Sequence, residues 1–361
     1  MSARPTTSKT ASETPTVTDS ADTKAGAKPT LHVGIDLGTS RTAIAASNGQ
    51  RHQLFSCVGK PKDAVAEKLL GKRLLFGQEA INHRLAVEFF RPLEKGVIKP
   101  DGPNVEAVRA LMQHAVSLVE AADDDVVYAV IGAPARATWE SKKLIIDIAR
   151  ELFDGVMITS EPFSVAYGLD ILTDALIVDI GAGTIDLCRM HGTFPSEEDQ
   201  VTIDKAGDFI DTTLADSIRG QFPDAQFSME MIKNIKEKHG FVVGSNEKVQ
   251  VELTVNGRPK MFDITANVKT SCAKMIPEMV EAIRQLVGSF DPEFQSRLRH
   301  NVVIGGGGSQ LRGLRQMVED GLAELGGGKV TLVEEPVYAG ANGALKIARD
   351  MPSQYWERMG H

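Results

Sequence analysis

Paired cysteines, long apolar runs and an excess of positive charge are all missing from this sequence of 361 residues. Its three cysteines, Cys57, Cys188 and Cys272, are far apart and in no metal-ligand spacing. We therefore expect reduced thiols in a core, as in a cytosolic protein. No apolar run approaches the roughly 20 residues that cross a bilayer. The start of the chain also lacks the apolar stretch of a secretory signal.

Acidic residues outnumber basic ones, 48 to 40, which gives a formal net charge of −8. Phosphate backbones and anionic lipids repel such a chain, so we expect neither a nucleic-acid partner nor direct membrane insertion. Residues 1–30 contain almost no large apolar side chain. Because a segment that buries so little surface cannot offset its ordering entropy, we predict a disordered polar tail there.

Strands and helices alternate along the rest of the chain, which predicts an α/β fold with mostly central sheets. The pattern restarts after Ser160. We predict a first half at 31–170, a second half at 171–336, and a closing helix and tail at 337–361 that pack back on the first half. Apolar periodicity predicts helices at 104–122, 137–153, 208–221, 228–239, 265–289, 310–325 and 337–349. Asn104 is the expected N-cap of the first of these.

Two glycine turns in this chain follow one plan. In GIDLGTSRTAI a strand over 31–37 ends near Asp36, and in VDIGAGTIDL a strand over 174–180 ends near Asp179. Each turn holds a threonine and is followed by a strand that runs back, so both are hairpins. They lie about 140 residues apart and each opens one half, which indicates two related halves that face each other.

The residue types of the two turns suit a polyphosphate. Glycine turns expose backbone N–H groups, and no Cβ blocks an approaching phosphate. Hydroxyls add donors, and Asp36 and Asp179 stand where they could hold Mg²⁺ through its water shell. An ordinary glycine turn with solvated acids explains one such motif more easily than two. The predicted phosphate-binding residues are Gly38, Thr39, Ser40, Gly181, Ala182, Gly183 and Thr184.

A third glycine run, in VVIGGGGSQLRGL, follows a strand at 301–304. Glycines before a helix N-terminus suit contact with a phosphate or a ribose, although glycine runs also serve as plain connectors. We expect Ser309 to cap the following helix and the loop to form the adenosine-side wall. Its predicted binding residues are Gly305, Gly306, Gly307 and Ser309.

These motifs, in this order, resemble those of the actin, Hsp70 and sugar kinase superfamily over nearly all of residues 31–350. With VIGAPA, SEPFSVAYGLD, GTFPSEEDQVT and GANGALKIA they are most similar to the bacterial actins, among them the filament proteins that align magnetosomes. The resemblance implies an actin-like ATPase fold. Two related, ribonuclease H-like α/β halves would surround a central cleft that binds ATP or ADP with Mg²⁺.

The resemblance also implies residue roles. Glu161 falls where the family places the group that orients the attacking water, Asp179 joins it as a catalytic acid, and Asp186 lies near the phosphates. From the residues alone, Glu161 is better explained as a helix N-terminal acid that follows the cap Ser160 and is favoured by the helix dipole.

The stretch MIKNIKEKHG lies where the family contacts ribose and base, which implies that Lys233, Lys236 and Glu237 bind the adenosine. Many relatives carry an acid three residues before the lysine, whereas this chain has Lys233 there. That departure puts the ribose hydrogen bond in doubt. A solvated helix face explains the same stretch.

By resemblance, the protein polymerises head-to-tail with ATP and depolymerises after hydrolysis, in cytoplasmic filaments that organise magnetosomes together with magnetosome-associated proteins. Such contacts do not close, so they build filaments. The loops RLLFGQEA and AVEFFRPLEKG, with Phe89 and Phe90, are candidates for the contact unless they pack on their own subdomain. Two alternatives are a non-polymerising ATPase scaffold and a small-molecule kinase, which needs a base beside a substrate pocket.

Overall fold

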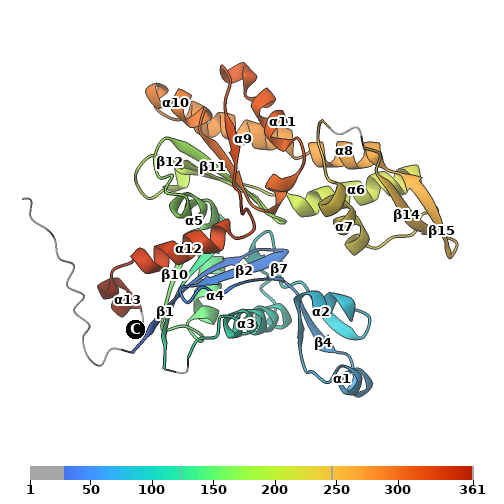
Figure 1. Ribbon diagram of the computed structural model, residues 1–361, viewed down its shortest axis with the longest axis horizontal. Helices are drawn as coiled ribbons and strands as arrows, with labels where there is room; N and C mark the ends of the chain where they lie inside the picture. The colour runs from blue at the N-terminus through green and yellow to red at the C-terminus, as the bar shows by residue number, and fades with distance from the viewer. Residues whose placement is uncertain (1–27, 123, 245–246, 360–361) are drawn as a thin grey trace, which may run out of the picture.

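The computed structural model describes residues 28–122, 124–244 and 247–359. The predicted disordered tail lies outside the described residues up to residue 27, and Thr30 already opens the first strand. Two bodies, each built on a central sheet, lie on either side of a pair of helices, α5 (Glu161–Gly168) and α12 (Ala339–Asp350) (Figure 1). The predicted α/β class is confirmed.

The sheet of the first body has the strand order β10-β9-β1-β2-β3. Its strands are β1 (Thr30–Leu37), β2 (Arg41–Ala46), β3 (Arg51–Phe55), β9 (Val126–Ala133) and β10 (Gly155–Ser160). Strands β1, β2 and β3 pair antiparallel, whereas β9 pairs parallel with both β1 and β10.

The sheet of the second body has the order β13-β12-β11-β16-β17. Its strands are β11 (Ala175–Ile180), β12 (Ile185–Met190), β13 (Gln200–Ile203), β16 (Val302–Gly305) and β17 (Val330–Leu332). The first three again pair antiparallel, and β16 again pairs parallel with both of its neighbours. The two sheets therefore share one topology, strand for strand.

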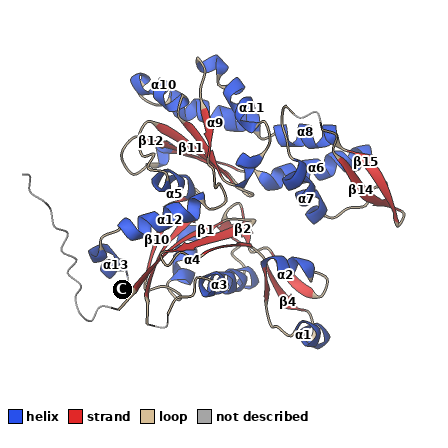
Figure 2. Ribbon diagram, in the orientation of Figure 1, coloured by secondary structure: helices blue, strands red, loops and turns tan. Residues whose placement is uncertain are grey.

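Helices cover the sheets, and small strands form outer units (Figure 2). The other helices are α1 (Ala64–Leu70), α2 (Gly77–Asn82), α3 (Gly102–Ser117), α4 (Trp139–Ala149), α6 (Gly207–Gln221), α7 (Met229–His239), α8 (Thr265–Ala273), α9 (Ile276–Gly288), α10 (Pro292–Arg299), α11 (Leu314–Gly321) and α13 (Ser353–Met359). The other strands are β4 (Val58–Pro61), β5 (Leu75–Phe76), β6 (Val87–Phe90), β7 (Leu93–Glu94), β8 (Val97–Ile98), β14 (Gln250–Val255) and β15 (Arg258–Asp263). Within the described part of the chain, no helix has the length and apolar character that a membrane span requires.

Two elements join the bodies at their centre. Helix α12 packs on α5 so closely that a Cβ at Gly343 would overlap the carbonyl of Ser164. An apolar cluster continues from these helices to β9 and β11. The C-terminal helix α13 adds Trp356, which is buried and stacks on Tyr128 of β9 at 4.8 Å between ring centroids. The division at 170 and 336 stays a prediction.

Three helix predictions are corrected. Helix α3 begins at Gly102, and its N-cap is Asp101, whose carboxylate accepts the backbone N–H of Asn104 at 3.0 Å. The helix expected at 265–289 is two helices, α8 and α9, because Pro277 has no N–H to continue a hydrogen-bond ladder. The helix expected at 310–325 is shorter and begins only at Leu314.

Candidate functional site

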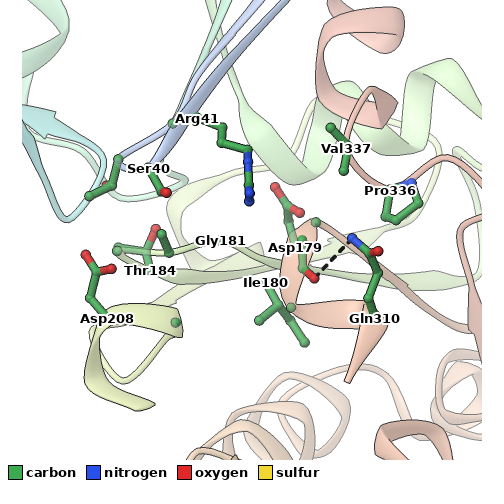
Figure 3. A pocket seen from close by; sticks show the side chains of 18 of the residues that line it. Ser40, Arg41, Asp179, Ile180, Gly181, Thr184, Asp208, Gln310, Pro336 and Val337 are labelled. Carbon is green, nitrogen blue, oxygen red and sulfur yellow. Dashed lines mark hydrogen bonds between the residues drawn. The ribbon is translucent and has the colours of Figure 1, made fainter. Parts of the chain in front are cut away.

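A cavity of about 430 Å³ lies between the two bodies. Turns from both halves line it, and Figure 3 shows Ser40 and Arg41 on one wall facing Gly181 and Thr184 on the other. Every residue predicted to bind phosphate lines this cavity. So do Asp36, Asp179, Glu161, Lys233, Lys236, Glu237, Gly306 and Gly307.

Sequence reasoning missed part of the lining. Arg41, Asp208, Gln310 and the pair Pro336 and Val337 also face the cavity (Figure 3). Arg41 directly follows Ser40 and the first turn in the sequence. This adjacency is the signal that could have identified Arg41 as a residue of the cavity. Gln310 directly follows the predicted Ser309, whereas Asp208, Pro336 and Val337 come from segments that only the tertiary fold brings here.

The first turn is held open by neighbouring hydroxyls. A Cβ at Gly38 would lie 2.6 Å from the carbonyl oxygen of Arg41, so only glycine fits this turn. Ser56 donates its hydroxyl to the Gly38 carbonyl at 2.6 Å. Thr39 Oγ1 accepts the N–H of Gly96 at 2.7 Å, which leaves the threonine proton for another partner.

The second turn meets the first. The N–H of Gly181 donates to the Thr184 carbonyl at 2.9 Å and closes the hairpin. A Cβ at Gly183 would overlap Thr39 Oγ1 and the backbone of Lys95. Glycine at this position therefore lets the two halves approach to contact across the cavity.

Three carboxylates, those of Asp36, Asp179 and Glu161, line the cavity, and a fourth, that of Asp186, lies near them. Asp36 and Asp179 are each the second-last residue of their strands, β1 and β11, Asp186 lies opposite Asp179 in the β11–β12 register, and Glu161 begins α5. Burial raises the pKa of Asp36 to about 6. Burial, followed by the charges of Asp36 and Asp186, raises the pKa of Asp179. Burial and the same neighbours, with Asp179, raise the pKa of Glu161.

Asp186 is the most firmly held of these acids. Its Oδ1 accepts the N–H of Ala135 at 2.8 Å and the hydroxyl of Thr202 at 2.6 Å. Its Oδ2 is buried without a hydrogen-bond partner. Burial raises the pKa of Asp186, and these hydrogen bonds oppose the rise. Asp186 therefore ties the second sheet to the first half and adds charge near the cavity.

The acids fit a hydrated divalent cation better than a direct protein cage. Among the described residues, no three or more His, Cys, Asp or Glu side chains are placed so that they could hold one metal ion directly. Glycines leave space beside two of the carboxylates, because a Cβ at Gly340 would lie 2.7 Å from Asp36 Oδ2 and one at Gly306 would overlap Asp179 Oδ1. Mg²⁺ keeps several waters and takes one or two carboxylates together with phosphate oxygens. Asp36 and Asp179 match that donor set.

Glu161 is buried, with 7% of its surface exposed. Its predecessor Ser160 makes no side-chain cap hydrogen bond to α5. A favourable helix dipole contributes about 0.3–1 kcal/mol to a surface acid and does not require burial among other acids. Ordinary helix-end stabilisation therefore does not explain why Glu161 faces the cavity.

Helix α7 contributes three charged side chains with different partners. Lys236 Nζ donates to Asp211 Oδ2 at 2.8 Å and to the Gly207 carbonyl at 2.9 Å. Glu237 accepts both ends of the Arg41 guanidinium, at 2.8 and 3.0 Å. The ammonium of Lys233, expected on the adenosine side, lies 2.6 Å from the Ser40 hydroxyl of the first glycine turn.

The third glycine run differs from its predicted form. Gly306 adopts a φ of 73°, and a 3-10 turn at Gly307–Gln310 follows. Ser309 is buried and donates its hydroxyl to the Gly306 carbonyl at 2.8 Å, so it does not cap a helix. Gly313 is the N-cap of α11. Gly305 and Ser309 lie behind the cavity lining rather than in it.

Duplicated sheets with one glycine turn each, facing across a polar cavity, define an actin-like fold with a nucleotide-type site. The MreB/Mbl protein family matches residues 30–354, and the chain belongs to this family. The expected membership among the bacterial actins is thereby confirmed.

Comparison with individual proteins shows which members of the family this chain resembles. The chain is 41% identical over 335 residues to the actin-like protein MamK of Paramagnetospirillum magneticum, covering 92% of this chain and 96% of that protein. It is equally identical to MamK of Magnetospirillum gryphiswaldense, covering 92% and 93%. A MamK-like protein of Paramagnetospirillum magneticum is 34% identical, covering 91% and 97%.

Solved structures of related proteins have the same fold as this chain. A MamK double-helical filament has a TM-score of 0.87 at 40% identity, covering 89% of this chain and 99% of that one. A non-polymerising MamK mutant bound to AMPPNP has a TM-score of 0.70 at 40% identity, covering 90% and 100%. MreB5 of Spiroplasma citri bound to AMPPNP, at 19% identity, has a TM-score of 0.75, covers 91% and 98%, and supports the fold alone.

Proposed function

We propose that this protein is a filament-forming actin-like ATPase that binds ATP in the cavity and hydrolyses it to ADP and phosphate. One observation carries the proposal: two matching glycine turns, one from each half, meet across a cavity that Asp36, Asp179 and Glu161 also line. The solved MamK filaments and the AMPPNP-bound MamK mutant, both at 40% identity, support the same function.

The nucleotide would lie between the turns. Backbone N–H groups and hydroxyls of the two turns would hold the phosphates, because both walls present donors without blocking side chains. Gly306, Gly307, Lys236 and Glu237 would line the adenosine side. Gly305 and Ser309 would support that wall from behind.

Asp36 and Asp179 would hold Mg²⁺ through its waters. When bound, the ion supplies positive charge that neutralises the phosphates and the buried acids. Without such a charge, burial disfavours ionisation of both carboxylates, as their raised pKa values indicate. The acids are therefore suited to a cation that arrives with the nucleotide.

Glu161 would orient the attacking water. It is buried at the start of α5, lines the cavity and lies near the other acids. A carboxylate at this place can accept a hydrogen bond from water and align it in line with the terminal phosphate. Asp179 would assist as the second catalytic acid.

Filament contacts would come from exposed apolar side chains. Phe89 and Phe90 are partly buried and pack on apolar clusters of the first half, which makes them weak candidates. Val65 and Leu69 on α1 and Leu85 beyond α2 are more than three-quarters exposed. These three extend the candidate contact surface of the same outer unit.

By similarity to MamK, the filaments would lie in the cytoplasm and organise magnetosomes into a chain with magnetosome-associated proteins as partners. This part of the proposal rests on family resemblance and on the relatives alone.

Sedimentation combined with phosphate release, with and without Mg-ATP, tests the function. We expect pelleting that depends on ATP and hydrolysis that rises steeply with protein concentration. Hydrolysis without a pellet at any concentration would contradict filament formation and favour a scaffold. Phosphate transfer to a sugar faster than to water would favour a kinase.

A further inference from the structure

We propose that Lys233 is a positioning residue that directs the Ser40 hydroxyl toward the nucleotide phosphates and makes the site favour di- and triphosphates over a monophosphate. This inference rests on the proposed function. It differs from the family-implied role of this helix in binding ribose and base.

The contact crosses the cleft. Lys233 comes from α7 in the second body, and Ser40 belongs to the first phosphate turn in the first body. The two atoms, Nζ and Oγ, are 2.6 Å apart. Both residues line the main cavity and also an adjoining cavity of about 230 Å³, so the pair forms part of the wall between them.

The lysine is buried without an anionic partner. Its residue is 6% exposed, and among the described residues no carboxylate lies within 4.0 Å of its ammonium. Two nearby acids are engaged elsewhere: Glu237 with Arg41 and Glu230 with Arg91. The ring of Phe55, 4.7 Å from Nζ, is the other favourable contact.

A buried ammonium is unfavourable unless an anion or several acceptors satisfy it. Burial lowers the pKa of Lys233, in keeping with this imbalance. A polyphosphate beside Ser40 would supply the missing negative charge. The site is therefore completed by the ligand rather than by the protein.

The chemistry of the pair sets the direction of the Ser40 hydroxyl. An ammonium has donors and no acceptor, so Ser40 Oγ accepts in this bond and its own proton is left for another partner. Ser40 lines the phosphate end of the cavity. The lysine thereby converts Ser40 into a dedicated donor for a phosphate oxygen.

Binding of Mg-ATP, Mg-ADP and AMP to the full chain tests this. We expect Lys233→Met to weaken ATP and ADP about 10- to 100-fold, because hydrogen bonds to charged groups are worth that much. AMP affinity is expected to stay within about twofold. Lys238→Met, on the exposed face of the same helix, is the matched control and is expected to change none of the three affinities.

Ser40→Ala, introduced into the natural chain and into Lys233→Met, tests whether Lys233 acts through the Ser40 hydroxyl or only through its own charge. If Lys233 acts through Ser40, the serine substitution weakens ATP strongly in the natural chain and little in Lys233→Met. Purely additive effects would contradict positioning. Equal losses for ATP and AMP would overturn the inference and return Lys233 to the adenosine.

Thermal unfolding and nucleotide binding together distinguish a failure of the positioning role from a failure of the proposed function. Lys233→Met removes a buried charge, so we expect its nucleotide-free form to unfold at an equal or higher temperature than the natural chain, and affinity loss then reflects the site and not misfolding. If the natural chain binds no nucleotide at all, the proposed function fails. Binding that is unchanged by Lys233→Met overturns only the positioning role.

Discussion

The two glycine turns belong to sheets of identical topology, yet they differ in length and charge. Asp36 on β1 lies opposite Ala43, whereas Asp179 on β11 lies opposite Asp186. The first turn is followed at once by a cation, Arg41. The duplicated backbone thus sets where ligand-facing residues stand, and the individual side chains give each wall its own charge.

The two bodies also differ in charge along the rims of the cleft. In three ion pairs that join the bodies, the first body supplies the cation and the second supplies the acid. These pairs are Arg41–Glu237, Arg91–Glu230 and Lys95–Asp204. Opposite charges on the two rims favour a closed cleft, whereas the acids inside favour a bound cation. Each prediction below tests one side of this comparison.

The largest effect is expected at Glu161, the buried acid that begins α5 in the first half. Glu161→Ala is expected to lower phosphate release about 100-fold or more, because a positioned acid or base contributes at least that much. Nucleotide binding and pelleting should persist, giving longer-lived filaments. Single-turnover phosphate release alongside sedimentation measures both, and normal release would rule out Glu161.

The second body alone, among the described residues, contains an ion pair with both side chains less than a tenth exposed, Arg189–Asp199. Asp199→Ala is expected to reduce the free energy of unfolding by about 3 kcal/mol, since it strands a buried guanidinium. Urea denaturation measures the loss. A change below about 1 kcal/mol would show that water replaces the carboxylate readily.

The same pair predicts a pH dependence. Burial alone would raise the pKa of Asp199, but hydrogen bonds from the Ser196 backbone, His191 and Arg189 lower it to about 2. The unfolded pKa is near 3.8. The stabilisation is therefore complete above pH 4 and lost as pH falls from about 4 to 2, by about 1–2 kcal/mol after solvent screening. Asp199→Ala should remove that slope in denaturation curves across this range.

A substitution of Asp179 tests whether the acids that face the cavity bind a cation. Asp179→Asn is expected to weaken Mg-nucleotide binding about tenfold, the lower end of losses seen when residues around a metal change. Because burial disfavours the charged form, the nucleotide-free variant should be equally or more stable. Calorimetric titration and thermal unfolding measure the two effects. Unchanged affinity would remove Asp179 from the metal role.

The smallest effect is expected at the rim. Arg91→Ala and Glu230→Ala should each change stability by about 0.5 kcal/mol or less, because half-exposed pairs are screened by solvent. A double-mutant cycle at low and high salt measures their coupling. Lys143 and Asp147, paired within α4, form the control. Coupling that persists at high salt would show that the rim contributes more to closure than its exposure implies.

Much of the fold followed from local pattern. The hairpin of β14 and β15 is encoded locally, because Asn256 and Gly257 at its turn have positive φ, at 50° and 75°, which this dipeptide tolerates. The two glycine turns were recognisable for the same local reason. The break between α8 and α9 was missed because apolar periodicity continues across it.

Part of the candidate site could be predicted from the sequence. The turns and their acids are contiguous in sequence, so their joint role was open to inference before the fold. Asp208 and Val337 were not, because each faces the cavity from a segment that is distant along the chain from the predicted motifs. The contact of Lys233 with Ser40 was also hidden, since it spans 193 positions.

The sequence by itself determined the two glycine turns, the acids that end their strands and the repeated strand plan, because these depend on local backbone preferences and side-chain alternation. Only the tertiary structure decided which charges face each other across the cleft. Burial and pairing depend on how the two bodies meet, and that is why the buried ammonium of Lys233 lies against the Ser40 hydroxyl of the facing body rather than on a solvated helix face.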